Sequence, residues 1–272
     1  MLILKRYAQN AKIPAQKSAK VSPMPDLASA IHYPRRRIRR TLARGLGRAL
    51  LTLGARVHIK GRENFPRRGP LIVVGNHVAV MEAVLMVVLP PWPVELIGSV
   101  DVPHERSSDL IMRFYGFIPV RRGSYDRAAL TAGLNVLRQG GILGIFPEGG
   151  HWEAGAMRGQ TGVAWLSQKS GAPVLPIGFS GMYGALAAML HGQRPRMGMT
   201  VGRPLPAARV DAPGGKAYLE GYAAEVVAAV RALLPPEELS HGPAITDERL
   251  SLETSASDGA GAPAAIPEAL AI

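Results

Sequence analysis

The sequence of 272 residues contains no cysteine. This absence excludes disulfide bonds, zinc sites built from thiolates and catalysis by a thiol nucleophile. The sequence also has no uninterrupted apolar run of about 18 residues, the length that a membrane-spanning helix requires. Its longest apolar stretch, residues 71–100, is broken by His77, Glu82 and Glu95 and by prolines at 90, 91 and 93. We therefore predict no spanning helix, and we predict no signal peptide because residues 1–34 lack a continuous apolar segment and a cleavage site.

Aromatic residues are scarce as well, at 6% of the chain, whereas the formal net charge is +12. A charge of this size favours an anionic partner, which can be nucleic acid, anionic lipid or a phosphorylated substrate. Nucleic acid is the least favoured of the three, because the arginine-rich segment has no interleaved aromatic residues and no known binding module is recognisable. We therefore expect an anionic membrane surface or a phosphorylated ligand as partner, and no nucleic acid.

Residues 1–34 are punctuated by proline and predict a flexible N-terminal tail, and residues 35–57 then have helical periodicity. Apolar side chains recur every three or four positions, with arginines around much of the remaining circumference. The apolar positions are Ile38, Leu42, Leu46, Leu50, Leu53 and Val57. Such a helix either lies in a bilayer interface with its arginines on lipid phosphates, or packs on its own domain as an ordinary surface helix. We favour the interface helix, because the density of arginine exceeds what solubility requires.

After this helix, short apolar runs alternate with helical patterns. Strands are predicted at residues 71–75, 94–100, 117–120, 142–146, 174–179 and 197–201, and helices near residues 80–89, 106–114, 125–139, 158–170 and 216–234. Continuous apolar strands separated by helices indicate one α/β domain, residues 35–238, with a largely parallel central sheet flanked by helices. Residues 239–272 become rich in Ala, Ser, Gly and Pro and predict a disordered C-terminal tail.

One segment suited to chemistry follows the first predicted strand, where His77 precedes Glu82 by five residues. A histidine can deprotonate an attacking hydroxyl if a second group fixes its tautomer and stabilises the imidazolium. Five residues on a continuous helix correspond to about 500° of rotation, so the two side chains would not share a face. They can meet only if His77 lies in the turn and Glu82 in the first turn of the next helix. Taken alone, such a pair also occurs without any catalytic role.

Two further segments follow predicted strands. Arg121 and Arg122 come directly after residues 117–120, at a carboxyl end where ligands of open parallel sheets bind. Guanidinium groups suit phosphate because they donate two parallel hydrogen bonds, although the same pair is compatible with a solvated basic loop. Glu148 and Gly149 come after residues 142–146, where glycines let a ligand approach the backbone closely. The glycines disfavour a helical metal pair of Glu148 with His151, so we expect no metal.

A proline at position 176 interrupts the strand predicted at 174–179 and indicates a bend or a shaped wall. Together with the other three segments, in this order and spacing, it resembles the 1-acyl-sn-glycerol-3-phosphate (lysophosphatidate) acyltransferase family. The likeness extends over residues 57–202 and includes residues 61–66, Gly-Arg-Glu-Asn-Phe-Pro.

The resemblance implies an α/β acyltransferase domain within residues 35–238 that needs no metal or cofactor. It also implies acyl-CoA or acyl-carrier protein as donor, a lysophospholipid acceptor in phospholipid biosynthesis, and a peripheral location on the cytoplasmic face of the cell membrane. By analogy with the family's motifs, the resemblance implies that His77 is the general base and Glu82 its partner. It implies that Arg121 or Arg122 binds the acceptor phosphate. It also implies that Glu148 and Gly149 bind the acceptor and that Pro176 lines the site. Direct transfer is expected, because Gly178–Met182 lacks the final glycine of a nucleophile elbow.

Two positions depart from the family pattern. Glu82 stands where the family has aspartate, and Gly150-His151 stands where the family continues with threonine and arginine. The extra methylene of Glu82 displaces its carboxylate by about 1 Å. The missing arginine leaves the acceptor head group open, with Arg158 as a candidate substitute. Two alternatives therefore remain: an acyltransferase with a different lysolipid or glycolipid acceptor, and a degenerate member that binds lipid without turnover.

Overall fold

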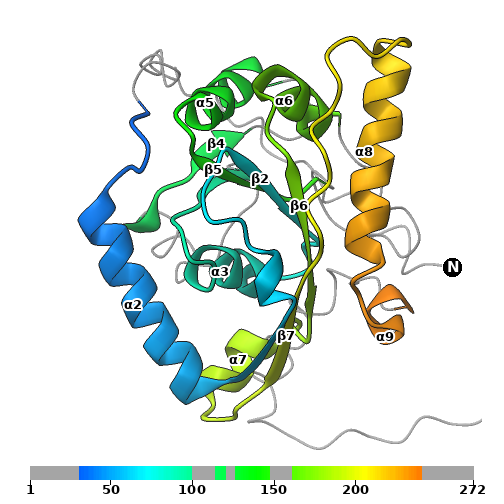
Figure 1. Cartoon of the computed structure of the whole chain (residues 1–272). Helices are drawn as coiled ribbons and strands as arrows, with labels where there is room; N and C mark the ends of the chain where they lie inside the picture. The colour runs from blue at the N-terminus through cyan, green and yellow to red at the C-terminus, as the bar shows by residue number, and fades with distance from the viewer. Residues whose placement is uncertain (1–30, 100–113, 121–125, 148–160, 241–272) are drawn as a thin grey trace, which may run out of the picture.

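The computed structural model describes residues 31–99, 114–120, 126–147 and 161–240, which form an α/β domain around one seven-stranded sheet (Figure 1). The strands are β1 (Arg56–Lys60), β2 (Leu71–Gly75), β3 (Glu95–Ser99), β4 (Ile118–Val120), β5 (Ile142–Ile145), β6 (Val174–Ser180) and β7 (Arg196–Val201). Their order is β1-β7-β6-β2-β5-β3-β4, and every neighbouring pair is parallel except β6–β7. The prediction of a single, largely parallel sheet is confirmed.

Helices cover both faces of this sheet. They are α2 (Arg37–Gly54), α3 (Val80–Val88), α5 (Arg127–Arg138), α6 (Gly162–Ser170), α7 (Ala185–Leu190), α8 (Lys216–Arg231) and the short α9 (Pro236–Ser240), with a 3-10 turn at Arg62–Asn64. Two hydrophobic cores separate the layers, with α2, α3 and α7 packed on one face and α5, α6 and α8 on the other. The helix predicted at 106–114 lies almost wholly outside the described residues. Neither α7 nor α9 was predicted.

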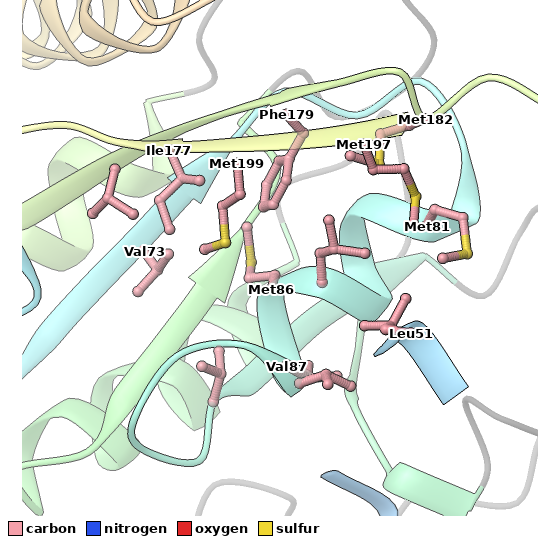
Figure 2. Packing of buried hydrophobic residues seen from close by; sticks show 14 of the residues in the cluster. Leu51, Val73, Met81, Met86, Val87, Ile177, Phe179, Met182, Met197 and Met199 are labelled. Atoms are coloured by element: carbon pink, nitrogen blue, oxygen red, sulfur yellow. The ribbon is translucent and has the colours of Figure 1, made fainter. Parts of the chain in front are cut away.

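The alternation of β2 divides its side chains between the two cores. Leu71 and Val73 face α3, whereas Ile72 and Val74 face the opposite core, and all four are fully buried. On the α3 face, methionines crowd around Phe179 (Figure 2). Gly75 ends β2 against that ring, since a Cβ at this position would lie 2.6 Å from Cε2 of Phe179. The packing thus fixes where β2 ends and where the following turn begins.

The helix predicted at 35–57 is shorter than expected, because α2 ends at Gly54 and residues 56–60 form strand β1. The Arg56 amide donates to Pro195 O, and β1 pairs along β7 from Arg56–Arg196 to Lys60–Thr200. Val57 continues the apolar spacing of the helix, which made the boundary hard to see. Residues 56–60 also alternate between exposed and half-buried, which is the pattern of an edge strand.

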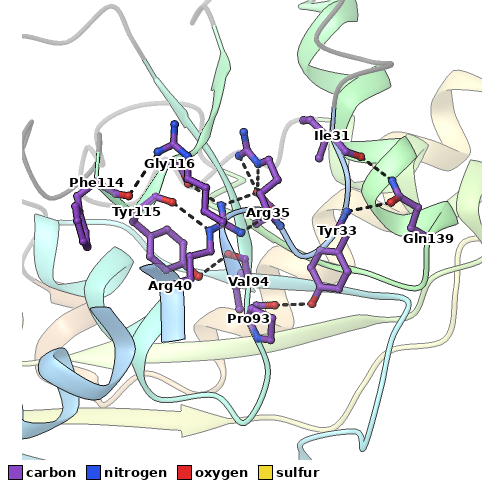
Figure 3. Close-up of polar contacts among 12 residues, drawn as sticks. Ile31, Tyr33, Arg35, Arg40, Pro93, Val94, Phe114, Tyr115, Gly116 and Gln139 are labelled. Carbon is purple, nitrogen blue, oxygen red and sulfur yellow. Dashed lines mark hydrogen bonds and ion pairs between the residues drawn. The ribbon is translucent and has the colours of Figure 1, made fainter. Parts of the chain in front are cut away.

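The end of the predicted N-terminal tail is attached to the domain. Ile31 is buried, the Tyr33 amide donates to Gln139 Oε1 at 3.0 Å, and Gln139 Nε2 donates to Ile31 O at 2.8 Å (Figure 3). Residues 31–34 therefore pack on the domain instead of belonging to a tail, and residues 1–30 lie outside the described part. At the other end, α9 includes residues 239 and 240, while the rest of the predicted C-terminal tail, 241–272, is likewise outside it.

Helix α2 turns part of its arginine-rich face inward. Arg40 is 1% exposed and forms an ion pair with the fully buried Glu95 of β3, and Arg35 donates to the same carboxylate (Figure 3). Arg40 also donates to Tyr115 O and Gly116 O, just before β4. Burial opposes ionisation of Glu95, but hydrogen bonds and charge from Arg40 and Arg35 outweigh it and hold the pKa of this carboxyl below its usual range.

Further along the helix, Arg44 and Arg48 donate to the carbonyls of Val87, Val88 and Pro90, which closes the C-terminal end of α3. The apolar stripe of α2 therefore faces outward. Its members are Ile38 at 77% exposure, Leu42 at 66%, Leu46 at 62%, Leu50 at 54% and Leu53 at 74%. An ordinary surface helix packs its apolar stripe on its own domain, whereas α2 exposes its apolar stripe.

Candidate active site

The turn between β2 and α3 presents His77 at the carboxyl edge of the sheet. Asn76, 1% exposed, fixes this turn to the end of β6, because its side chain donates to Phe179 O at 2.9 Å and accepts from the Phe179 amide at 2.8 Å. Through these two bonds, the Asn76 side chain extends the hydrogen bonding between β2 and β6 by one residue beyond Gly75. Sequence reasoning missed this role, although a polar residue directly after a buried strand was the available signal.

Glu82 lies at the third position of α3 and is fully buried. Its carboxylate accepts hydrogen bonds from the backbone amides of Val78 and Ala79, each at 3.0 Å, so it closes the start of the helix as a capping group. The same carboxylate faces the imidazole of His77, with Oε2 3.9 Å from Nδ1. This distance is in the range of an ion pair and longer than a hydrogen bond. The predicted geometry, with His77 in the turn and Glu82 in the first helical turn, is what the structure has.

One face of the imidazole is covered by Phe146, which directly follows β5. The two rings stack with centroids 4.4 Å apart and an interplanar angle of 20°. The His77 side chain remains 33% exposed. With Nδ1 turned toward Glu82 and one ring face against Phe146, Nε2 is the nitrogen directed away from the carboxylate. Phe146 was not predicted as a site residue, and its position two residues before Glu148 was the only signal.

The phosphate-binding and acceptor-binding candidates Arg121, Arg122, Glu148 and Gly149 lie outside the described residues, as does Arg158. The residues before them are described. Val120 ends β4 and Pro147 follows β5, and both strands run parallel to β2 through β3 and β5. Parallel strands bring their carboxyl ends to one edge of a sheet, so Val120 and Pro147 lie at the same edge as His77.

Pro176 stands apart from the histidine. It is buried within β6 opposite Val74, on the face of the sheet away from α3. The amide of Gly202 donates to Pro176 O at 2.9 Å, and a Cβ at Gly202 would meet both Pro176 and Leu233, which follows α8. The position therefore shapes the β6–β7 and α8 packing, and among the described residues Pro176 does not line the surroundings of His77.

A buried carboxylate that faces a histidine at the carboxyl edge of a parallel sheet is an arrangement suited to proton transfer from a substrate hydroxyl. Residues 56–180 match the profile of the Acyltransferase family. It is 27% identical over 132 residues to the 1-acyl-sn-glycerol-3-phosphate acyltransferase of Borreliella burgdorferi, an alignment that covers 47% of this chain. The chain spans about half the length of that curated relative, 53%.

The fold is also that of a solved structure, the 1-acyl-sn-glycerophosphate acyltransferase PlsC from Thermotoga maritima. The superposition has a TM-score of 0.53 at 22% sequence identity and covers 77% of this chain and 84% of the other. At this identity the likeness supports the architecture. Within the part of the chain that the structure describes, no helix has the length and hydrophobicity to cross a bilayer.

Proposed function

We propose that the protein transfers a fatty acyl group from acyl-CoA or acyl-carrier protein to the free hydroxyl of 1-acyl-sn-glycerol 3-phosphate, a step of phospholipid biosynthesis. The family match over residues 56–180 and the names of both relatives support this reaction. The observation that carries it is the pairing of His77 with the buried carboxylate of Glu82 at 3.9 Å. Acyl transfer to a hydroxyl needs a group that removes one proton from that hydroxyl, and this pair supplies it.

The proposed reaction is a direct transfer. Nε2 of His77 takes the proton of the acceptor hydroxyl as its oxygen bonds to the thioester carbonyl carbon. The tetrahedral intermediate then collapses, the carbon–sulfur bond breaks, and the imidazolium returns its proton to the leaving thiolate. Glu82 stabilises the positive imidazolium in between, since a carboxylate favours the charged form of a neighbouring histidine. The two backbone amides on Glu82 keep its carboxylate in place during these steps.

The acceptor phosphate is assigned to Arg121 and Arg122, with Glu148 and Gly149 holding the glycerol part. Their sequence positions support this assignment, because they follow Val120 and Pro147 by one or two residues and these lie at the sheet edge of His77. Guanidinium groups bind phosphate with paired hydrogen bonds. Pro176 is not included, given its place on the other face of the sheet.

The same proposal includes a peripheral location at the cytoplasmic face of the cell membrane, with α2 as the docking helix. Its outward stripe of five apolar side chains supports this, as does the net charge of +12, which favours an anionic surface. Inward-facing Arg40, Arg44 and Arg48 hold the helix to the domain, which keeps its apolar stripe on the outer face.

A matrix of donors and acceptors tests the reaction. Acyl-CoA and acyl-carrier protein are each combined with 1-acyl-sn-glycerol 3-phosphate, with other lysophospholipids and with glycolipid acceptors, and both thiol release and acylated product are measured. We expect thiol release that depends on the lysophosphatidate and equals the diacyl product formed. Turnover with another acceptor alone would correct the head group, and no acceptor-dependent release with any pair would identify a lipid-binding protein without turnover.

A further inference from the structure

We infer that α7, together with the turn before it, is a second lipid-contacting element, so that the bilayer meets the protein on two elements beside the site. The inference rests on the proposed docking of α2 and extends it to a part of the chain about 130 residues further along. It names a lipid bilayer as the partner and an apolar edge with a basic fringe as the surface.

The first observation is exposure. Tyr183, in the turn before α7, is 57% exposed, and Leu190, the last residue of the helix, is 78% exposed. Leu190 is the most exposed of the large apolar side chains in the described residues. A tyrosine with an apolar ring and a polar tip suits the boundary between acyl chains and head groups, and leucine suits the acyl region.

The second observation is continuity with α2. A Cβ at Gly54, the last residue of α2, would lie 2.9 Å from Cε of Met189, so the two helix ends are in contact. Arg194 joins them as well, because its Nη2 donates to Thr52 O at 2.8 Å and to Ala55 O at 3.3 Å. The exposed Leu190 therefore belongs to an element whose end, at Met189, is in contact with the end of α2.

The third observation is the position of α7 beside the site. Met182 and Ala185 are buried in the core that contains Met81, the residue next to Glu82 in the first turn of α3. Figure 2 shows Met81 near Met182 and Met197, with Leu51 of α2 below them. Elements that contact lipid at this point would place the bilayer next to the turn of His77, from which a lysophospholipid acceptor has to come.

The basic residues near Leu190 favour a lipid bilayer over another apolar partner for this surface. His191 and Arg194 follow Leu190 within four residues and are exposed. Neither forms an ion pair with a carboxylate among the described residues. Apolar side chains bordered by cations fit the acyl boundary of an anionic membrane.

A single exposed apolar side chain is common on any protein surface, and Val210 is such a case. It is 76% exposed, and it lies between Arg209 and Asp211, which pair with each other at 3.5 Å. Gln168 of α6 donates to Arg209 O, which puts Val210 on the other face of the sheet from α2 and α7. Val210 is therefore the matched control for Leu190.

Because the chain has no cysteine, single substitutions can carry one environment-sensitive fluorophore each. Leu190→Cys, Leu46→Cys and Val210→Cys are labelled and mixed with vesicles of phosphatidylglycerol and phosphatidylethanolamine, with quenchers in the aqueous phase and in the acyl region. We expect the probes at 190 and 46 to shift to shorter wavelength and to respond to the acyl quencher, whereas the probe at 210 stays aqueous. Unlabelled Leu190→Asp should weaken vesicle partitioning about fivefold or more, with Val210→Asp unchanged.

The inference is overturned if the probe at 190 behaves like the probe at 210 while the probe at 46 enters the bilayer. The docking of α2 would then stand without α7. If neither the probe at 190 nor the probe at 46 responds, the proposed docking of α2 itself fails. Any binding of the protein to vesicles then uses another surface.

Discussion

Glu82 performs two tasks with one carboxylate. It caps the start of α3 through the amides of Val78 and Ala79, and its Oε2 faces Nδ1 of His77. The longer side chain of glutamate was expected to displace the carboxylate by about 1 Å relative to the family's aspartate. The helix cap absorbs this displacement, because Glu82 bends back onto the turn that contains His77. The departure from the family pattern therefore keeps a carboxylate beside the imidazole.

Replacing Glu82 by glutamine should reduce the acyl-transfer rate by about 100-fold or more. The amide oxygen can take over the cap, but the NH2 group would then face Nδ1 and stabilise the tautomer with the proton on Nε2, which cannot act as base. Glu82→Asp keeps the charge and should lose much less. Steady-state kinetics with circular dichroism to verify folding distinguish the two, and equal turnover of Glu82→Gln and wild type would show that Glu82 is not the partner of His77.

Arg121 and Arg122 should matter for the acceptor far more than for the acyl donor. Each charge-assisted hydrogen bond to phosphate contributes about 1.5–3 kcal/mol, so the double alanine variant should lower kcat/KM for lysophosphatidate at least about tenfold. Lysine at both positions should recover part of the loss. Arg67→Ala/Arg68→Ala is the control, since this exposed pair precedes β2 at the opposite edge of the sheet. An unchanged acceptor KM with a defect in the thioester KM would instead place the pair on coenzyme A phosphates.

At the scale of elements, arginine side chains attach α2 to the domain, and the apolar side chains of this helix are exposed. The stripe is what a basic amphipathic helix predicts, but Arg40 is buried on Glu95, and Arg44 and Arg48 close the end of α3. These arginines serve the domain and not lipid phosphates. Removing residues 1–56 would therefore remove the proposed docking helix and break a buried ion pair together, which makes point substitutions the better test.

Glu95→Gln should destabilise the protein by about 3 kcal/mol at pH 7, because it leaves Arg40 buried without its counter-charge. The folded pKa of Glu95 is lowered, so its stabilising contribution is complete above the ordinary carboxyl pKa and is lost as pH falls through the folded value. Urea unfolding at pH 7 and near pH 3 should therefore show a smaller difference between variant and wild type in acid. Glu220→Gln, which breaks an exposed pair with Lys216, should change stability by less than about 0.5 kcal/mol. A pH-independent difference would rule out this role for Glu95.

Replacing Leu42 and Leu46 by glutamine should weaken binding to anionic vesicles about tenfold and leave unfolding unchanged, since both side chains are exposed and glutamine is a good helix former. Added salt should weaken binding of the wild type further by screening exposed charges. Vesicle sedimentation measures both effects. Loss of stability in place of loss of binding would mean that the stripe packs against protein.

At the scale of the whole molecule, local patterns predicted most of the fold. Residues 71–75 form β2 with the predicted bounds, and α3 and α5 start within two residues of theirs, α5 being capped by Asp126. Contacts between residues far apart in the sequence could not be predicted. The β1–β7 edge, the Asn76 contact with Phe179 and the Arg40–Glu95 pair join residues 55 to 140 positions apart, and no periodicity encodes them.

The candidate site could be predicted from the sequence to about the same extent as the fold. The spacing of His77 and Glu82 led to the correct turn-and-helix geometry because one local element holds both. Phe146 comes from a neighbouring strand and was missed, and Pro176 was placed by motif alone, although strand alternation turns it to the other face.

The central claim is that His77 removes the proton from a lipid hydroxyl during acyl transfer. The most direct test compares wild type, His77→Ala and His58→Ala in one assay of diacyl product from acyl-CoA and 1-acyl-sn-glycerol 3-phosphate. His58 is the control because it is an exposed histidine of β1, away from the turn of His77. We expect His77→Ala to fold normally and to lose at least about 100-fold in kcat, and His58→Ala to stay within about twofold of wild type. A folded His77→Ala variant that retains most of the wild-type rate would contradict the account.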